Sequence, residues 1–285
     1  MNPVLQEIID TLDVEPIERN LYRGRNQKTE HVFGGQVLAQ AIAAAYRTLD
    51  TEHHLHSIHA YFLRKGDWTI PILYDVERIR DGRSFTTRQV VAIQHGLAIF
   101  NMASSWQKRE AGLHHALPMP DVPPPEALRG EREAYLEYAK TNPAVMRYAS
   151  RFDAIDVRQV ERISMTDDQA HPPVKHTWLK TRDPLADDPE VHLAMLAYMS
   201  DLDFMGTSML PHVLTGKAKS IYGTSLDHAL WFHRPFRADE WLLFAKESPN
   251  ARGARGFVRG QFFTRSGELV ATAAQECLIR PLTTR

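Results

Sequence analysis

The sequence lacks the features on which several large classes of protein depend. A single cysteine, Cys277, among 285 residues excludes an internal disulfide and any site built from several cysteines. The 34 Lys and Arg nearly balance the 35 Asp and Glu, so no overall charge attracts nucleic acid or an anionic membrane. No apolar run reaches the roughly 18 residues of a membrane-spanning helix, and there is no P-loop. We therefore expect neither a nucleic-acid partner nor a membrane span.

The composition that remains is that of an ordinary globular protein, with 43% hydrophobic and 24% charged residues. The first residues, MNPVLQEIIDTLDVE, are acidic and amphipathic, unlike a signal peptide. The last, PLTTR, differ from a peroxisomal SKL-type address. We expect a cytoplasmic protein.

A proline-rich segment divides the chain. Residues 117–130, LPMPDVPPPEALRG, carry five prolines, which remove backbone donors and favour an extended connector. We therefore expect an N-terminal repeat over 1–116, a connector with a linking helix over 117–150, and a C-terminal repeat over 151–285.

Each half contains a helix that is almost free of charge. Val32–Tyr46 has no charged residue, and Val191–Ser200 is similar and is followed by Asp201. A helix that is apolar nearly all round must be buried. Strand-like runs follow each helix: Leu55–Leu63, Ile70–Ile79, Ser84–Gln94 and Leu97–Gln107 in the first half, and Thr224–Phe232, Trp241–Glu247, Gly256–Thr264 and Leu269–Ile279 in the second.

The two halves also share sequence. HAYFLRKGDW (59–68) is similar to HALWFHRPFRADEW (228–241), and RSFTTRQVVAIQHGLAIF (83–100) is similar to RGFVRGQFFTRSGELVAT (255–272). An internal repeat indicates one supersecondary unit used twice. The predicted unit is a central buried helix wrapped by a mainly antiparallel sheet, which gives an α+β fold.

Two polar residues stand in unusual places. Asp201 opposes the dipole at the C-terminal end of a buried helix, so it is a candidate for an abnormal pKa and a functional site; alternatively, it ends the helix and reaches solvent. Gln275 interrupts the small, apolar run VATAAQECLI, where a buried amide needs partners. Aligning the repeats places Gln275 near Ala103, so the first half lacks this amide.

Other motifs indicate chemistry less directly. Residues 223–227, GTSLD, resemble a nucleophile elbow around Ser225 but lack its final glycine and precede a strand. His228 beside Asp227 is the only sign of a paired Asp/His site. A set of strand histidines invites a metal-site interpretation: His53, His54, His56 and His59. Arg252, Arg255 and Arg259 form a cluster that could be a solvated face or could bind phosphates. For the histidines we expect exposed or hydrogen-bonded strand residues rather than metal ligands.

Over nearly its whole length the sequence resembles the type II acyl-CoA thioesterases. The matching stretches are VFGGQVLAQA (32–41), HSIHAYFLRKGD (56–67), YDVERIRDGRSF (74–85), LAYMSDLDF (196–204), LDHALWFHRPFRADEWLL (226–243), ARGFVRGQFFTRSGELVAT (254–272) and AQECLIR (274–280). The resemblance implies a double-hotdog fold and a catalytic set that positions water, which falls here on Asp201, Ser225 and Gln275. Many members carry threonine where this sequence has Ser225.

The resemblance implies hydrolysis of acyl-CoA to a free fatty acid and CoA. We expect medium- to long-chain substrates, a general-base mechanism, no cofactor, no metal, and a homo-oligomer. Two alternatives remain at this point: a non-catalytic acyl-CoA-binding sensor or scaffold on the same fold, and a hydratase or dehydratase built around Asp227 and His228.

Overall fold

The computed structural model describes the chain except for residues 28–30, 50–51, 144–151, 164–168, 213–220 and 282–285. The helical segments are α1 (Pro3–Leu12), α2 (Gly34–Tyr46), α3 (Glu131–Ala139) and α5 (Pro189–Ser200), with short 3-10 turns η1 (Pro125–Ala127) and η4 (Met205–Met209). No described helix combines the length and the hydropathy needed to cross a membrane.

Six strands precede the connector and seven follow it in the described part of the chain. The first group is β1 (Glu15–Glu18), β2 (Leu21–Gly24), β3 (His54–Phe62), β4 (Ile72–Asp81), β5 (Phe85–Gln94) and β6 (Leu97–Gln107). The second group is β7 (Ile155–Gln159), β8 (Val174–Thr181), β9 (Ile221–Ser225), β10 (Asp227–Phe232), β11 (Leu242–Arg252), β12 (Arg255–Thr264) and β13 (Leu269–Pro281).

The strands join into one antiparallel sheet with the same arrangement in each half. Its order is β1-β2-β4-β5-β6-β3-β10-β13-β12-β11-β8-β7, with β9 paired to β13. β3 and β10 meet at the centre, where His59 lies opposite Ala229. The predicted hairpin turn between β5 and β6 is confirmed, because His95 and Gly96 both have the positive φ of 49° and 72° that such a turn requires.

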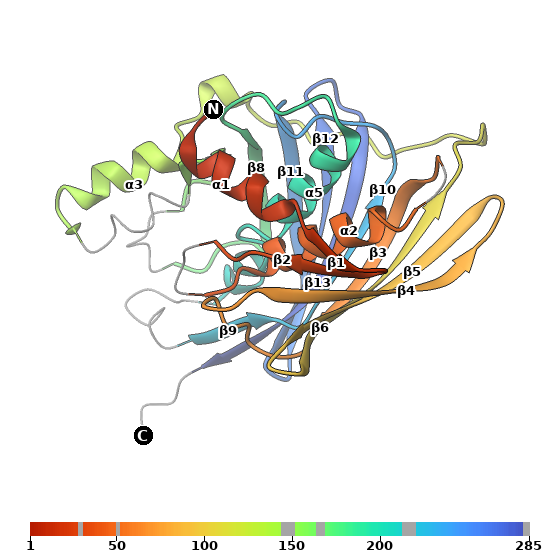
Figure 1. Cartoon of the computed structure of the whole chain (residues 1–285). Helices are drawn as coiled ribbons and strands as arrows, with labels where there is room; N and C mark the ends of the chain where they lie inside the picture. Colours follow the sequence, from red (N-terminus) through yellow and green to blue (C-terminus); the bar gives the residue numbers. More distant parts are fainter. Residues whose placement is uncertain (28–30, 50–51, 144–151, 164–168, 213–220, 282–285) are drawn as a thin grey trace.

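The two uncharged helices lie inside the curve of this sheet, which runs behind and below them in the view of Figure 1. They pack against each other, with their alanines and leucines in the main core. The N terminus of α2 meets the C terminus of α5, since Gly35 donates a backbone hydrogen bond to Asp201. The predicted α+β fold, with a buried helix against an antiparallel sheet in each half, is thus confirmed.

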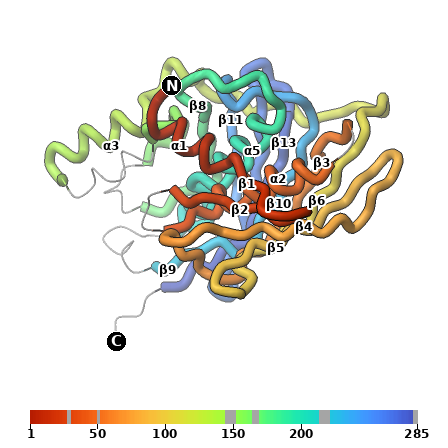
Figure 2. The backbone as a smooth tube through the Cα atoms, viewed as in Figure 1, coloured from red at the N-terminus to blue at the C-terminus, as the bar shows by residue number. Residues whose placement is uncertain are grey.

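The connector lies along the second half. Trp178 donates its indole N–H to the carbonyl of Pro123 at 2.9 Å, and Met119, Val122 and Leu128 cover a small second apolar cluster. Figure 2 shows this segment and α3 on the same side of the molecule as α1. The proposed boundaries at 116 and 150 stay a prediction.

Two expected elements differ from those observed. The single strand predicted over Thr224–Phe232 is two strands, because the pairing with β13 shifts by one residue around Leu226, between the pairs Ser225–Cys277 and Ala229–Ala274. The connector contains the turn η1, since proline is compatible with the first turn of a helix. The linking helix expected within 117–150 is α3 in the described part of the chain, and residues 144–150 lie outside it.

Candidate active site

Asp201 lies where the two central helices meet. α5 begins with Asp188 as its N-cap and Pro189 in its first turn, and it ends with Asp201 as its C-cap. The carboxylate of Asp201 accepts the backbone N–H of Gly35 in the first turn of α2. Because the N-cap of α2 is Phe33, whose side chain makes no capping hydrogen bond, Asp201 satisfies this helix end from another helix.

Two glycines make this approach possible. A Cβ on Gly34 would lie 2.7 Å from Oδ2 of Asp201, and a Cβ on Gly35 would lie 2.5 Å from the carbonyl of Tyr198. Both distances are shorter than any ordinary contact with a Cβ atom. The sequence Gly34-Gly35 therefore brings the positive end of the α2 dipole to the carboxylate.

The surroundings of Asp201 change its acidity. Burial raises its pKa from 3.8 to about 7, while the hydrogen bonds from Gly35 and Ser225 oppose this shift. The group is therefore balanced between acid and base near neutral pH, which is the condition under which a carboxyl group can take up a proton efficiently.

The structure brings the other two predicted site residues next to Asp201. The hydroxyl of Ser225, at the end of β9, lies 3.5 Å from Oδ1 of Asp201. Gln275 on β13 donates its amide N–H to Oγ of Ser225 at 2.9 Å and is only 1% exposed. Asp201 and Ser225 remain partly exposed, whereas Gln275 is behind them. The catalytic role of the three stays a prediction.

A fourth polar residue extends this row into the core. Nδ1 of His228 lies 2.6 Å from Oε1 of Gln275, and Nε2 lies 2.9 Å from Oγ of Ser200. The ring is fully buried, and this burial lowers the pKa of His228 to about 4. The sequence offered one signal for it, since position 228 shares the inward face of β10 with Leu230 and Phe232.

The Asp227–His228 pair that a hydratase would need does not form. Neighbouring strand residues point to opposite faces of a sheet. Asp227 accepts the backbone N–H of Glu276 at 2.6 Å, while His228 bonds to Gln275 and Ser200. Ser225 likewise contacts a carboxylate and an amide rather than a histidine, unlike the nucleophile of a serine-hydrolase triad.

The first half has the same backbone positions with other side chains. The central pair His59–Ala229 defines a twofold relation that exchanges Ile58 with His228. Ile58 lies opposite Ser104, whereas His228 bonds to Gln275, so Ser104 is the counterpart of Gln275.

The repeat alignment, which placed Gln275 near Ala103, was therefore wrong by one residue. It matched His59 with His228, but His59 is exposed and contacts the ring of Trp231, whereas His228 is buried. A shift of one residue exchanges the two faces of a strand. The conclusion that the first half lacks the amide is unchanged.

Three of the remaining candidates from the sequence, His56, Arg255 and Arg259, have structural partners. His56 bonds to Ser105 at 2.8 Å, and no group of three His, Cys, Asp or Glu suited to a metal occurs among the described residues. Arg255 and Arg259 are exposed and paired with Glu276 and Glu247. The absence of a cofactor or metal in the working protein stays a prediction.

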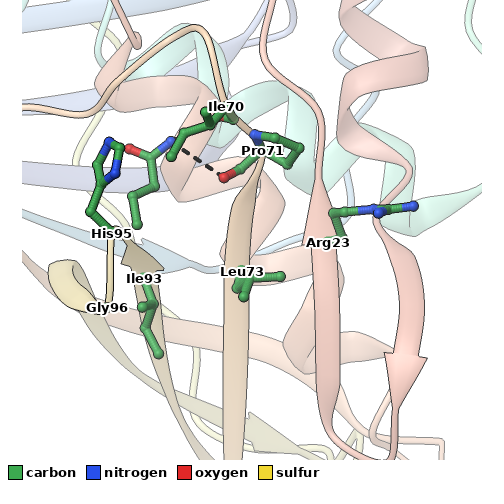
Figure 3. A pocket seen from close by; sticks show the side chains of 8 residues that line it. Arg23, Ile70, Pro71, Leu73, Ile93, His95 and Gly96 are labelled. Atoms are coloured by element: carbon green, nitrogen blue, oxygen red, sulfur yellow. Dashed lines mark hydrogen bonds between the residues drawn. The ribbon is translucent and has the colours of Figure 1, made fainter.

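A shallow depression lies on the first half at the β4–β5 edge. Figure 3 shows Ile70, Pro71 and Leu73 on one side and Ile93, His95 and Gly96 on the other, with Arg23 at the margin. The amide of Gln94 donates to the carbonyl of Ile70 at 2.9 Å and so supports the turn. The depression contains no carboxylate, and none of the three predicted site residues lines it.

Comparison with known proteins agrees with this architecture. A family model described as acyl-CoA thioesterase matches residues 149–278, and one described as acyl-CoA thioesterase N-terminal domain matches residues 23–107. Acyl-coenzyme A thioesterase 8 of Mus musculus is 41% identical over 96% of this chain and 88% of its own length. The chain belongs to the acyl-CoA thioesterase family.

Solved structures support the same assignment. An acyl-CoA thioesterase II from Mycobacterium marinum is 41% identical, covers 98% of this chain and 99% of its own, and superimposes with a TM-score of 0.82. A protein from Alicyclobacillus acidocaldarius described as having a hot dog fold superimposes with a TM-score of 0.73 at 17% identity, over 96% of this chain and 97% of its own. The predicted double-hotdog fold is confirmed.

Proposed function

We propose that this protein hydrolyses acyl-CoA thioesters and that Asp201 is the general base. Membership of the acyl-CoA thioesterase family supports the reaction. The observation that supports the base is the pKa of Asp201, raised to about 7 by burial, in a carboxylate that is still partly exposed to an incoming substrate. At neutral pH a substantial fraction is ionised, and the ionised form is basic enough to take a proton from water.

In this mechanism a water molecule lies between Asp201 and the thioester carbonyl. Its oxygen bonds to the carbonyl carbon while Asp201 takes its proton. The carbon–sulfur bond then breaks, the proton passes to the departing sulfur, and the products are a carboxylic acid and CoA. Ser225 and Gln275 hold the water and the carboxylate in position, which is a contribution of orientation rather than of bond formation.

The oxyanion that develops during attack needs hydrogen-bond donors. We assign this role to the backbone N–H of Gly34 at the N terminus of α2, because the N–H of Gly35 is already donated to Asp201. Gly34 lies beside Asp201, and the start of a helix carries the partial positive charge that stabilises an anion. The first half of the chain thus supplies a donor for the acid of the second half.

Apolar groups near the carboxylate favour an acyl chain of medium to long length. The ring of Phe62 would be 3.1 Å from a Cβ on Gly34, and Phe33 contacts the ring of Tyr198 with centroids 4.9 Å apart. Both phenylalanines are partly buried and pack on the core. We include in the proposal a cytoplasmic homo-oligomer that works without a cofactor.

The test is thiol release from a panel of acyl-CoA chain lengths. We expect wild type to turn over medium- and long-chain substrates, and Asp201→Asn to lose about 10²–10⁴ in kcat, the usual contribution of a positioned general base. Asp227→Asn, an acid on the outer face of the same region, is the matched control and should retain activity. If wild type binds acyl-CoA without releasing thiol, the sensor or scaffold alternative is correct; if Asp201→Asn is fully active, Asp201 is only a helix end.

A further inference from the structure

A single row of hydrogen bonds leads from the exposed edge of the site into the core. Oγ of Ser200 lies 2.9 Å from Nε2 of His228, whose Nδ1 lies 2.6 Å from Oε1 of Gln275. Nε2 of Gln275 lies 2.9 Å from Oγ of Ser225, which lies 3.5 Å from Asp201. His228 is the one member of this row, apart from Asp201, whose donor and acceptor positions depend on where a proton is held.

A neutral imidazole donates from one nitrogen and accepts at the other. Because burial lowers the pKa of His228 to about 4, the ring is neutral over the range in which Asp201 titrates. The ring therefore imposes one direction on every bond of the row, and there are only two directions to consider.

In the first direction the proton is on Nδ1 of His228. Ser200 then donates to Nε2, and Nδ1–H donates to Oε1 of Gln275, which leaves the amide N–H of Gln275 to donate to Ser225. The hydroxyl proton of Ser225 is then free to point at Asp201. This direction suits an ionised carboxylate, which can only accept.

In the second direction the proton is on Nε2. The ring donates to Ser200, whose hydroxyl turns to the carbonyl of Ala197, 2.8 Å away. Nδ1 must now accept, so the amide of Gln275 has to turn over and present its oxygen to Ser225. The hydroxyl proton of Ser225 then points at Gln275, and the oxygen lone pairs face Asp201. Only a protonated Asp201 is compatible with this arrangement.

We propose that His228 is a positioning residue which, by keeping its proton on Nδ1, directs the hydroxyl proton of Ser225 onto the ionised Asp201. The proposal rests on the proposed function of Asp201 as the base. His228 is buried and does not touch the substrate. It keeps the carboxylate of Asp201 ionised and oriented through Gln275 and Ser225.

The titratable groups around this row of hydrogen bonds do not set the direction of the bonds, so the ring of His228 does. The pKa of His228 responds to burial and to Gln275, and that of Asp201 to burial, Gly35 and Ser225. Among the described titratable groups, Tyr198 on α5 is the one whose pKa is raised in part by Asp201, and its hydroxyl donates to Gln27 at 3.1 Å. The ring of Phe204 packs 5.7 Å from that of His228.

The experiment compares His228→Leu, which removes both nitrogens, with His228→Asn, whose amide keeps a donor near the position of Nδ1. We expect His228→Leu to lower kcat about 10- to 100-fold with KM changed less than about threefold. The acid limb of its pH profile should move to higher pH, because Asp201 loses the Ser225 hydrogen bond that lowers its pKa. His228→Asn should restore most of the rate and the original limb. His59→Leu, on the exposed face of the paired strand, is the control.

A spectroscopic measurement on wild type keeps the proposal testable if His228→Leu does not fold. The 15N shifts of the ring, assigned by their loss in His228→Asn, should show the proton on Nδ1 at pH 8. A proton on Nε2 at that pH, or an unchanged acid limb in a folded His228→Leu, overturns the positioning role. Asp201→Asn separates the two ideas: if it stays active the proposed base is wrong, and if it is inactive while His228→Leu keeps the wild-type profile only the positioning role is wrong.

Discussion

The two halves of the sheet have nearly the same strand arrangement but end their central helices differently. α2 ends at the C-cap Arg47, which pairs with Asp13, whereas α5 ends at Asp201. The inward positions beside the helix follow the same contrast, with Ile58 and Ser104 in the first half where the second has His228 and Gln275. Both halves share the backbone arrangement, but only the second carries Asp201 and the row of hydrogen bonds behind it.

This difference shows that two repeats of one fold can contribute different residues to a single site. The first half has no counterpart of the acid, yet Gly34 and Gly35 of α2 stand against Asp201. The site therefore belongs to the contact between the repeats. The variants below test how far each half can change before the other is affected.

Among variants that keep Asp201, the largest loss of activity should come from a change in the first half. Gly35→Ala places a Cβ 2.5 Å from the carbonyl of Tyr198 and from a ring carbon of Phe33, so the helix ends must move apart. A displacement of about 1 Å in a catalytic site can cost about 100-fold in rate. We expect kcat/KM for thiol release to fall at least that much, while Gly112→Ala, which would meet nothing within 4 Å, is unchanged. A fully active Gly35→Ala would show that the first half does not contribute to the site.

Removing the hydroxyl of Ser225, in the second half, should lower activity less. Ser225→Ala removes a neutral hydrogen bond, which corresponds to about threefold to tenfold in kcat, and lost alignment of the water could deepen the loss by another tenfold. Ser225→Thr keeps the hydroxyl and should remain active. Intact-protein mass spectrometry during turnover checks the mechanism, since a trapped acyl-serine would mean that Ser225 is a nucleophile.

The acid should also reduce stability at neutral pH. The folded pKa of Asp201 is about 7 against an ordinary 3.8, so its stabilising contribution is present below about pH 4 and is lost as pH rises through 7. Asp201→Asn does not titrate, so we expect its Tm to exceed that of wild type by several degrees at pH 8. The excess should grow between pH 4 and pH 7 and then level off. Calorimetry showing an equal Tm difference at all pH values would argue against a buried, high-pKa carboxyl.

Substitution of Ser104, the counterpart of Gln275 in the first half, should have the least effect on activity. Ser104 accepts the indole N–H of Trp106 at 3.0 Å, and Trp106 is fully buried. Ser104→Ala leaves that N–H without its acceptor, which should cost about 1–3 kcal/mol in the free energy of unfolding. We expect kcat to change less than twofold, measured beside the unfolding curve. A large loss of kcat with normal stability would mean that the first half retains a site of its own.

The sequence predicted most of the fold because its periodic elements are local. The two uncharged helices and the β5–β6 turn follow from residues that are neighbours in the chain. Asp201 could be found because a carboxylate after an uncharged helix is unusual at any position. The three predicted site residues do lie together, although their roles await experiment.

What could not be predicted depends on contacts between distant segments. The break between β9 and β10 at Leu226 is a one-residue shift in their pairing with β13, which no local pattern records. The place of His228 in the hydrogen-bonded row could not be predicted, because it depends on Gln275 and Ser200 on other elements. Gly34 and Gly35 are ordinary first residues of a helix until Asp201 is placed beside them.

The pairing of β3 with β10 at the centre of the sheet has a consequence for how the chain could be cut. Each strand would become an unprotected edge if the halves were made separately, and its complement would be the other half. The connector keeps the two at an effective concentration in the millimolar range, typical of short tethers. Two polypeptides divided within residues 108–116 would thus form a split enzyme. Its recovery of thiol release on mixing would measure the strength of the pairing between β3 and β10.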